Sequence, residues 1–194
     1  EERKNFQAKA REQFQAIIDR AAADPVFAKQ AAKAMIRIRS QLIGLLRADG
    51  NFAEALKQVD ALLKEQPNAL EPLMERGHIL QALAEKDPKR YDEAVKWWTS
   101  IRMKLDNAPK TPKAAKKPKE YFEIIYNCAF CLVAQKDPEK NKQAAQLLNG
   151  TLALSPELDD PDRVEKYKAL LKQLPAAKTA PATTTKTKTT AKTK

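Results

Sequence analysis

Two cysteines separated by two residues form the motif in this sequence that most suggests chemistry. Cys128 and Cys131 stand in the stretch CAFC. A redox-active pair of this type follows a strand and lies at the N-terminus of a helix, which lowers the pKa of the attacking thiol. Here the pair lies inside the apolar run IIYNCAFCLVA, and a zinc site would need two further ligands in a chain with one histidine. We therefore predict buried core cysteines, with a redox pair and a zinc site as the alternatives.

Other residues that could support catalysis are sparse. The single histidine, His78, is predicted to be a surface residue rather than a catalyst. Trp98 is expected in the core. Trp97 points about 100° away on the same helix and is expected to pack against the next repeat, with partial exposure as the alternative. No Ser/His/Asp set, paired-carboxylate pocket, phosphate-binding loop or dinucleotide glycine fingerprint occurs in the sequence. The sequence therefore predicts a protein that is not an enzyme and that uses no metal or cofactor.

The positive charge of the chain is concentrated in two segments. Lys and Arg number 36 and Asp and Glu number 25, so the net charge is +11. Residues 108–119 and 175–194 hold five lysines each and no acid, and together supply 10 of these 11 charges. Their Pro, Thr and Lys content predicts little ordered structure. The charge pattern thus indicates two basic appendages on a nearly neutral folded body.

The sequence gives no targeting information. No run is apolar and long enough for a transmembrane helix, and the start, EERKNF, has no signal-peptide character. Because this start lacks a methionine, we expect the chain to be a fragment or a processed form. Its localisation is unknown from the sequence.

Composition and periodicity predict an all-α fold. Only four glycines occur, and Ala, Leu, Lys, Glu and Gln are abundant. Apolar residues recur at helical spacing, and Asp-Pro or Asp-Gly pairs separate the apolar stretches. We predict helices over about 3–22, 25–48, 52–66, 70–85, 91–105, 120–135, 140–154 and 161–174, joined by short turns into hairpins.

Three of the hairpins share a set of positions, which we call the repeat frame. Each second helix carries an alanine twelve residues before a closing position: Ala55 before Pro67, Ala94 before Asp106 and Ala144 before Pro156. The first helices contribute Arg39, Leu42, Ile43 and Leu46, then Leu73, Arg76, Gly77 and Leu80, then Ile125, Cys128, Ala129 and Leu132. Val59, Trp98 and Leu148 follow the three alanines by four residues. A small residue near a helix crossing lets two backbones approach, so we interpret the alanines as contact points.

The repeat frame resembles the tetratricopeptide repeat, whose signature is W-x2-LG-x2-Y, A-x3-F and P. The resemblance implies an all-α, right-handed superhelix of stacked antiparallel helix hairpins, that is, an α-solenoid. The implied repeat domain spans 25–174, with repeats at about 36–69, 70–108 and 122–158 and a capping helix at 161–174. Residues 1–24 would form the second helix of a truncated upstream repeat, 109–121 a lysine-rich insert, and 175–194 a disordered basic tail.

The function that the resemblance implies is a non-enzymatic scaffold for protein–protein interaction. Its partner, a peptide or a helix of another protein, would lie in the concave groove lined by the first helices. The residues expected to face this groove are Arg37, Gln41, Arg47, Met74, Glu75, His78, Gln81, Tyr126, Asn127 and Phe130. Tetratricopeptide proteins that bind the C-terminal carboxylate of a partner use a clamp of basic and asparagine side chains. Met74 and Glu75 occupy positions of that clamp here, so the clamp is not reproduced.

The alternative function is an adaptor for nucleic acid or for an anionic surface. It would use the lysine-rich insert and the basic tail. Lysines without interleaved aromatics or arginines give a weak, salt-sensitive contact with polyanions that does not read sequence.

The interpretation of the alanines can be tested by substitution. Ala55→Leu or Ala94→Leu should lower the free energy of unfolding by roughly 1 to 3 kcal/mol, because each adds volume at a helix crossing. Thermal unfolding followed by circular dichroism measures the effect. Melting curves unchanged by both substitutions would contradict the repeat frame.

Overall fold

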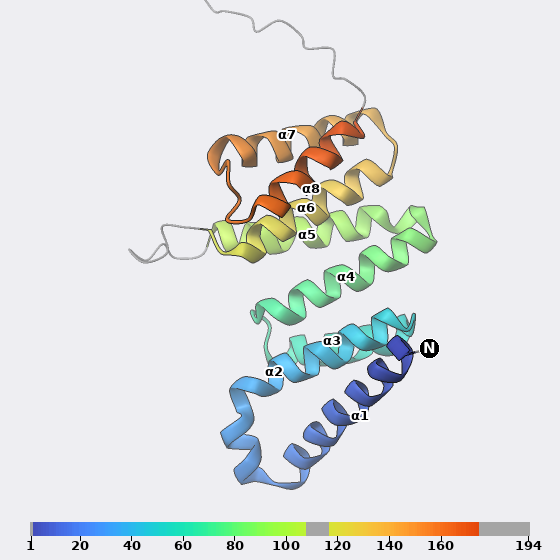
Figure 1. Cartoon of the computed structure of the whole chain (residues 1–194), viewed down its shortest axis with the longest axis vertical. Helices are drawn as coiled ribbons and strands as arrows, with labels where there is room; N and C mark the ends of the chain where they lie inside the picture. Colours follow the sequence, from blue (N-terminus) through green and yellow to red (C-terminus); the bar gives the residue numbers. More distant parts are fainter. Residues whose placement is uncertain (1, 108–116, 175–194) are drawn as a thin grey trace, which may run out of the picture.

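The fold is built from helices alone in the part of the chain that the structure, a computed structural model, describes: residues 2–107 and 117–174 (Figure 1). The helices are α1 (Glu2–Ala23), α2 (Pro25–Ala48), α3 (Phe52–Glu65), α4 (Leu70–Lys86), α5 (Tyr91–Asp106), α6 (Lys119–Ala134), α7 (Pro138–Leu154) and α8 (Pro161–Lys172), with a 3-10 turn, η1 (Pro88–Arg90), before α5. The prediction of an all-α fold and the predicted helix positions are confirmed. The basic tail at 175–194 and most of the lysine-rich insert, residues 108–116, lie outside the described residues.

Helix starts follow the capping chemistry that the sequence suggests. The side chains of Asp24, Asp137 and Asp160 each accept a hydrogen bond from a backbone N–H in the first turn of α2, α7 and α8. A proline follows each aspartate. Proline lacks a backbone N–H, but an N–H at this first helical position would have no acceptor within the helix, so no hydrogen bond is lost. Gly50, with φ of +78°, makes the turn between α2 and α3, a conformation that glycine adopts without strain.

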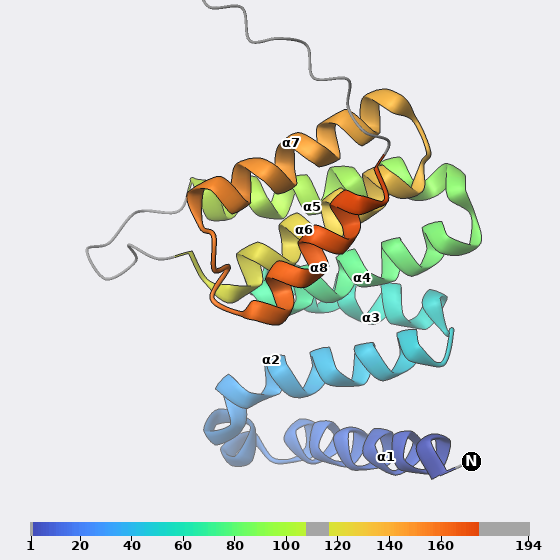
Figure 2. The same ribbon diagram turned by 45° about the horizontal axis from the view of Figure 1, so that its top comes forward.

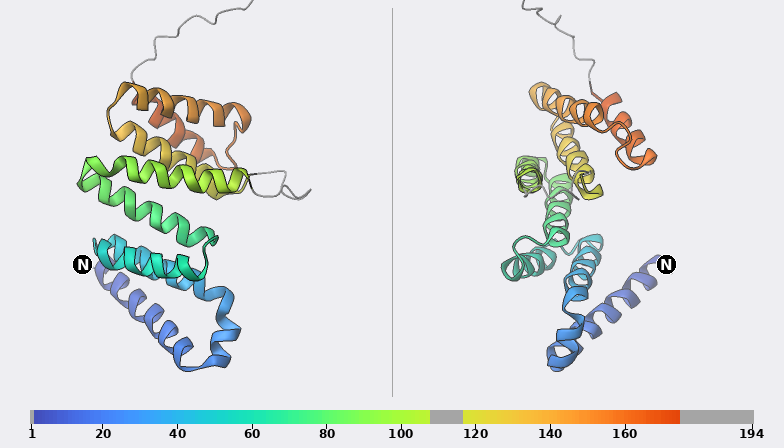
Figure 3. Two further views of the ribbon diagram at one scale, coloured as in Figure 1. Left: turned by 180° about the vertical axis from the view of Figure 1, so that it is seen from behind. Right: turned by 90° about the vertical axis from the view of Figure 1, so that its left-hand side faces the viewer.

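The helices form three antiparallel hairpins, α2–α3, α4–α5 and α6–α7, that follow one another along the long axis, which is vertical in Figure 1; Figure 2 shows the same hairpins in a view turned by 45°. Helix α4 packs against both α2 and α3, and α6 packs against α5, so each hairpin touches the next. Figure 3 shows α3 and α5 on one side of the row formed by α2, α4 and α6, with α1 and α8 on the other side. None of the described helices has the length and apolar character needed to cross a lipid bilayer.

The apolar positions within the helices of the repeat frame form the core. Ala55, Ala94 and Ala144 are fully buried, as are Val59, Trp98 and Leu148. One buried cluster joins α4 to α8, and a second, smaller one joins α2, α3 and α4. The predictions that Trp98 and the two cysteines are core residues are confirmed. Trp97 is half-buried, and its Nε1 donates a hydrogen bond to the Leu73 carbonyl at 2.9 Å, which fixes α5 on α4.

The closest helix approach in the second hairpin depends on Gly77. A Cβ added there would lie 2.6 Å from Cη2 and Cζ2 of Trp98, a distance too short for two carbon atoms. The indole ring is therefore in contact with the bare backbone of α4. Gly150 on α7 differs, because an added Cβ would meet nothing within 4 Å.

We expect Gly77→Ala to destabilise the protein. Overpacking against a buried, rigid ring costs roughly 1–3 kcal/mol, which exceeds the ~1 kcal/mol that alanine gains over glycine in a helix. Gly150→Ala is the matched control and should be neutral or stabilising by up to about 1 kcal/mol, since it gains propensity without a clash. Urea denaturation of both variants measures the difference. Equal stability of the two variants would show that the Gly77–Trp98 contact does not limit the packing.

Candidate functional site

The ten residues predicted to face the groove lie on the three first helices, and we call them the first-helix face. Helix α2 carries Arg37, Gln41 and Arg47, helix α4 carries Met74, Glu75, His78 and Gln81, and helix α6 carries Tyr126, Asn127 and Phe130. Nine of them are at least partly exposed, and Asn127 is buried. Arg37 and Gln41 make no side-chain hydrogen bond or ion pair with the described residues.

Polar residues of the first-helix face pair with one another from helix to helix. Arg47 Nε donates to Glu75 Oε2 at 3.3 Å, which links α2 to α4. His78 Nε2 lies 3.3 Å from Glu123 Oε1, which links α4 to α6. These contacts hold four polar side chains in fixed positions across the three hairpins.

Two further contacts fix the α4 part of this face. The thiol of Cys131 on α6 donates to Gln81 Oε1 at 3.7 Å. The His78 ring stands edge-on to Trp98, with ring centroids 5.2 Å apart. Because Trp98 contacts the backbone of Gly77, the position of the neighbouring imidazole follows from the packing of the core.

Glu123 also belongs to this face, although it is not among the ten residues predicted from the sequence. The hydrogen bond with His78 lowers the pKa of the Glu123 carboxyl below its usual value, against the opposing effect of burial. Helical spacing could have identified this residue, because Glu123 precedes Tyr126 and Asn127 by one turn and shares their face. Its pairing with His78 depends on how α4 and α6 pack.

Aromatic side chains cover the α6 end of the first-helix face. Tyr126 and Phe130 are half-buried and pack against the larger core cluster. The ring of Tyr126 lies against that of Tyr167 on α8, with centroids 6.0 Å apart. Tyr167 is fully buried and its hydroxyl donates to the Phe122 carbonyl at 2.6 Å, so it anchors α8 on α6. Burial raises the pKa of the Tyr167 hydroxyl, which therefore stays protonated as a donor.

A cleft of about 370 Å³ lies between α6 and the start of α8. It is lined by Glu123, Tyr126, Asn127, Asp160, Arg163 and Lys166. Asn127 is 7% exposed, and its Nδ2 has no hydrogen-bond partner among the described residues. The α8 residues could not be identified from the sequence, because their approach to α6 depends on long-range packing. The cleft offers mixed charges and a buried amide donor to a ligand.

The CxxC pair has the properties of a packing element. Cys131 is 0% exposed and Cys128 5%. Burial raises the pKa of both thiols, and the hydroxyl of Thr99 lies 3.6 Å from Cys128 Sγ. No group of three His, Cys, Asp or Glu side chains within 2–107 and 117–174 is placed to hold a metal ion. Both cysteines are thus poorly suited to act as nucleophiles at neutral pH.

Comparisons of the chain with protein families, with curated proteins and with solved structures find no match.

We expect both thiols to react slowly in the native protein. Cys128 and Cys131 should be protected from Ellman's reagent at pH 8, because the reagent attacks only accessible thiolates. Guanidinium should release two fast-reacting thiols per chain, and a Cys128→Ala, Cys131→Ala variant, the control, should release none. A fast native reaction at one cysteine would show that the pair is a reactive site.

Proposed function

We propose that the chain is a tetratricopeptide-like α-solenoid that serves as a non-enzymatic protein-interaction scaffold. Its partner is an extended peptide or a helix of another protein, bound across the first-helix face. The order of the hairpins and the burial of the repeat-frame residues support this proposal. A continuous row of first helices offers a partner one surface on α2, α4 and α6.

The observation that carries the proposal is the pairing of polar groups across this row. Arg47–Glu75 and His78–Glu123 hold their side chains before any partner arrives. All four side chains stay partly exposed, at 20–46%. Binding to fixed groups loses less side-chain entropy than binding to mobile ones, which favours affinity.

Apolar groups on the same face supply the second requirement of an interface. Met74, Tyr126 and Phe130 are half-buried, so they present apolar surface while the core holds them in place. Aromatic and methionine side chains are enriched at the centres of protein interfaces. A partner segment with an apolar residue flanked by polar groups matches this arrangement.

The adaptor for nucleic acid or an anionic surface is the alternative. It rests on the lysines of 108–119 and 175–194, which hold 10 of the 11 net charges of the sequence. It predicts binding that weakens steeply with salt.

A charge swap tests the proposed face. Arg47→Glu and Glu75→Arg each break the ion pair, and the double variant restores it with reversed charges. We expect each single variant to lose about 0–1 kcal/mol of stability, as for partly exposed pairs, and the double variant to regain it. Partner capture from a cell extract, quantified by mass spectrometry, should fall in all three variants, because the partner meets the wrong charges even when the fold is restored.

The pair Arg39–Glu65 provides the matched control. It links α2 to α3 through two hydrogen bonds of 2.5 and 3.0 Å and lies outside the first-helix face. The swap Arg39→Glu with Glu65→Arg should leave capture unchanged. Capture that survives the Arg47 and Glu75 variants, but disappears when residues 175–194 are deleted and the lysines of 110–119 become serine, would establish the adaptor instead.

A further inference from the structure

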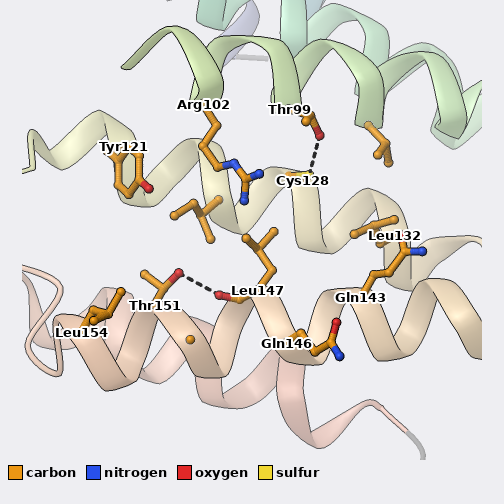
Figure 4. Close-up of a pocket in the computed structure, with 13 residues that line it drawn as sticks. Thr99, Arg102, Tyr121, Cys128, Leu132, Gln143, Gln146, Leu147, Thr151 and Leu154 are labelled. Atoms are coloured by element: carbon orange, nitrogen blue, oxygen red, sulfur yellow. Dashed lines mark hydrogen bonds between the residues drawn. The ribbon is translucent and has the colours of Figure 1, made fainter. Parts of the chain in front are cut away.

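A second cleft, separate from the first-helix face, lies between α5 and α7 with α6 as its floor (Figure 4). We call it the second-helix cleft. Its volume is about 490 Å³, within the range of ligand-binding pockets. Thr99 and Arg102 line it from α5, Tyr121 and Ile125 from α6, and Gln143 and Gln146 from α7. It shares no residue with the first-helix face.

The second-helix cleft contains one charged side chain and no carboxylate. Figure 4 shows Arg102 reaching from α5 toward α7, between Tyr121 and Cys128. Its guanidinium forms no ion pair with the described residues, and its Nε is buried without a hydrogen-bond partner among them. Asp106, one turn along α5, makes its direct ion pair with Lys117 at 2.6 Å and acts on Arg102 only through longer-range attraction. A half-buried cation without a direct ion pair favours an anionic ligand, because a partner charge offsets its desolvation.

The rest of the lining suits a peptide backbone and an apolar side chain. The amides of Gln143 and Gln146 make no hydrogen bond with the described residues, so they are available to backbone groups of a ligand. Ile125 on the floor of the cleft is buried, so the apolar surface open to a ligand comes from Leu147, which is half-buried, and from Leu154, which is 88% exposed and forms an apolar edge.

The length of the cleft favours a chain that passes through it. Its α7 wall runs from Gln143 to Leu154, which corresponds to roughly 16 Å of helix. An extended segment of about five residues covers this distance. A free small anion or a single side chain would leave most of the wall uncovered.

We propose that the second-helix cleft binds an extended internal segment of a partner protein, in which an Asp or Glu side chain pairs with Arg102 and a neighbouring apolar side chain covers Leu147 and Leu154. This inference does not depend on the proposed function of the first-helix face.

Peptide selection tests the proposal on the full chain. A display library of random octapeptides, presented with both ends blocked, is panned in about 0.3 M salt, which screens the lysine-rich segments. We expect the selected peptides to share an acidic residue beside an apolar one. Fluorescence anisotropy of a synthetic, capped peptide then gives its affinity. Arg102→Met should weaken binding by about tenfold or more, as should replacing the peptide's acidic residue by its amide.

A double-mutant cycle tests whether the peptide carboxylate pairs with Arg102 itself. If the carboxylate pairs with Arg102, the amide peptide should bind wild type and Arg102→Met with the same affinity. Lys96→Met is the matched control, because it removes one exposed positive charge from α5 outside the cleft and should change the affinity less than twofold. Gly150→Leu, which adds a side chain to the cleft wall, should block binding without altering the charge.

Several results would overturn the proposal. They are the selection of no peptide, selected peptides without an acidic residue, equal losses in Arg102→Met and Lys96→Met, and binding only to peptides with a free C-terminal carboxylate. Thermal melting of Arg102→Met establishes that the variant is folded. The Arg47 and Glu75 variants should leave peptide binding to this cleft unchanged, so failure here and failure of the proposed function are separate results.

Discussion

The contact between Trp98 and the bare backbone at Gly77 determines how close α4 and α5 come to one another. The ring carbons lie 2.6 Å from the position that a Cβ would take, so any side chain larger than hydrogen separates the helices. The same indole ring contacts His78 on the first-helix face and fixes its position. Trp97, the residue before Trp98, donates a hydrogen bond to the Leu73 carbonyl. The middle hairpin, α4–α5, contacts both other hairpins. Its internal packing therefore also determines where side chains of the proposed binding surface lie.

The other hairpins meet the same constraint with different residues. The position of Gly77 in the repeat frame is taken by Ile43 and by Ala129, and the position of Trp98 by Val59 and by Leu148. All of these residues are buried, and each pair lies in a single core cluster. The second and third hairpins pair a small residue with a large one, Gly77 with Trp98 and Ala129 with Leu148, whereas the first pairs two residues of intermediate size. The sizes differ because the volume between two packed helices is filled without voids. The alanines at 55, 94 and 144 keep the crossing itself close.

The helices and much of the core could be predicted from the sequence because their causes are local. Capping aspartates such as Asp24 and helical apolar spacing act within a few residues, so helix positions and buried alanines agree with the structure. The pairings of the candidate sites could not be predicted in this way. His78 meets Glu123 across 45 residues of sequence, and Arg102 makes no direct ion pair with the described residues, whereas Asp106 on the same helix pairs with Lys117. Such arrangements depend on rotamers and helix approach, which no local pattern encodes.

Helix α6 connects the two proposed binding surfaces. Tyr126 and Phe130 contribute to the first-helix face, whereas Tyr121 and Ile125 contribute to the second-helix cleft. The buried residues of α6 include both cysteines, of which Cys128 also lines the second-helix cleft and Cys131 donates a hydrogen bond to Gln81 of the first-helix face. Small, protonated thiols fit a helix covered on several sides, since they fill volume without requiring a strong hydrogen bond. The motif that most suggests redox chemistry is thus part of a rigid support, and surfaces built on a rigid helix hold their contact groups with the precision that recognition needs.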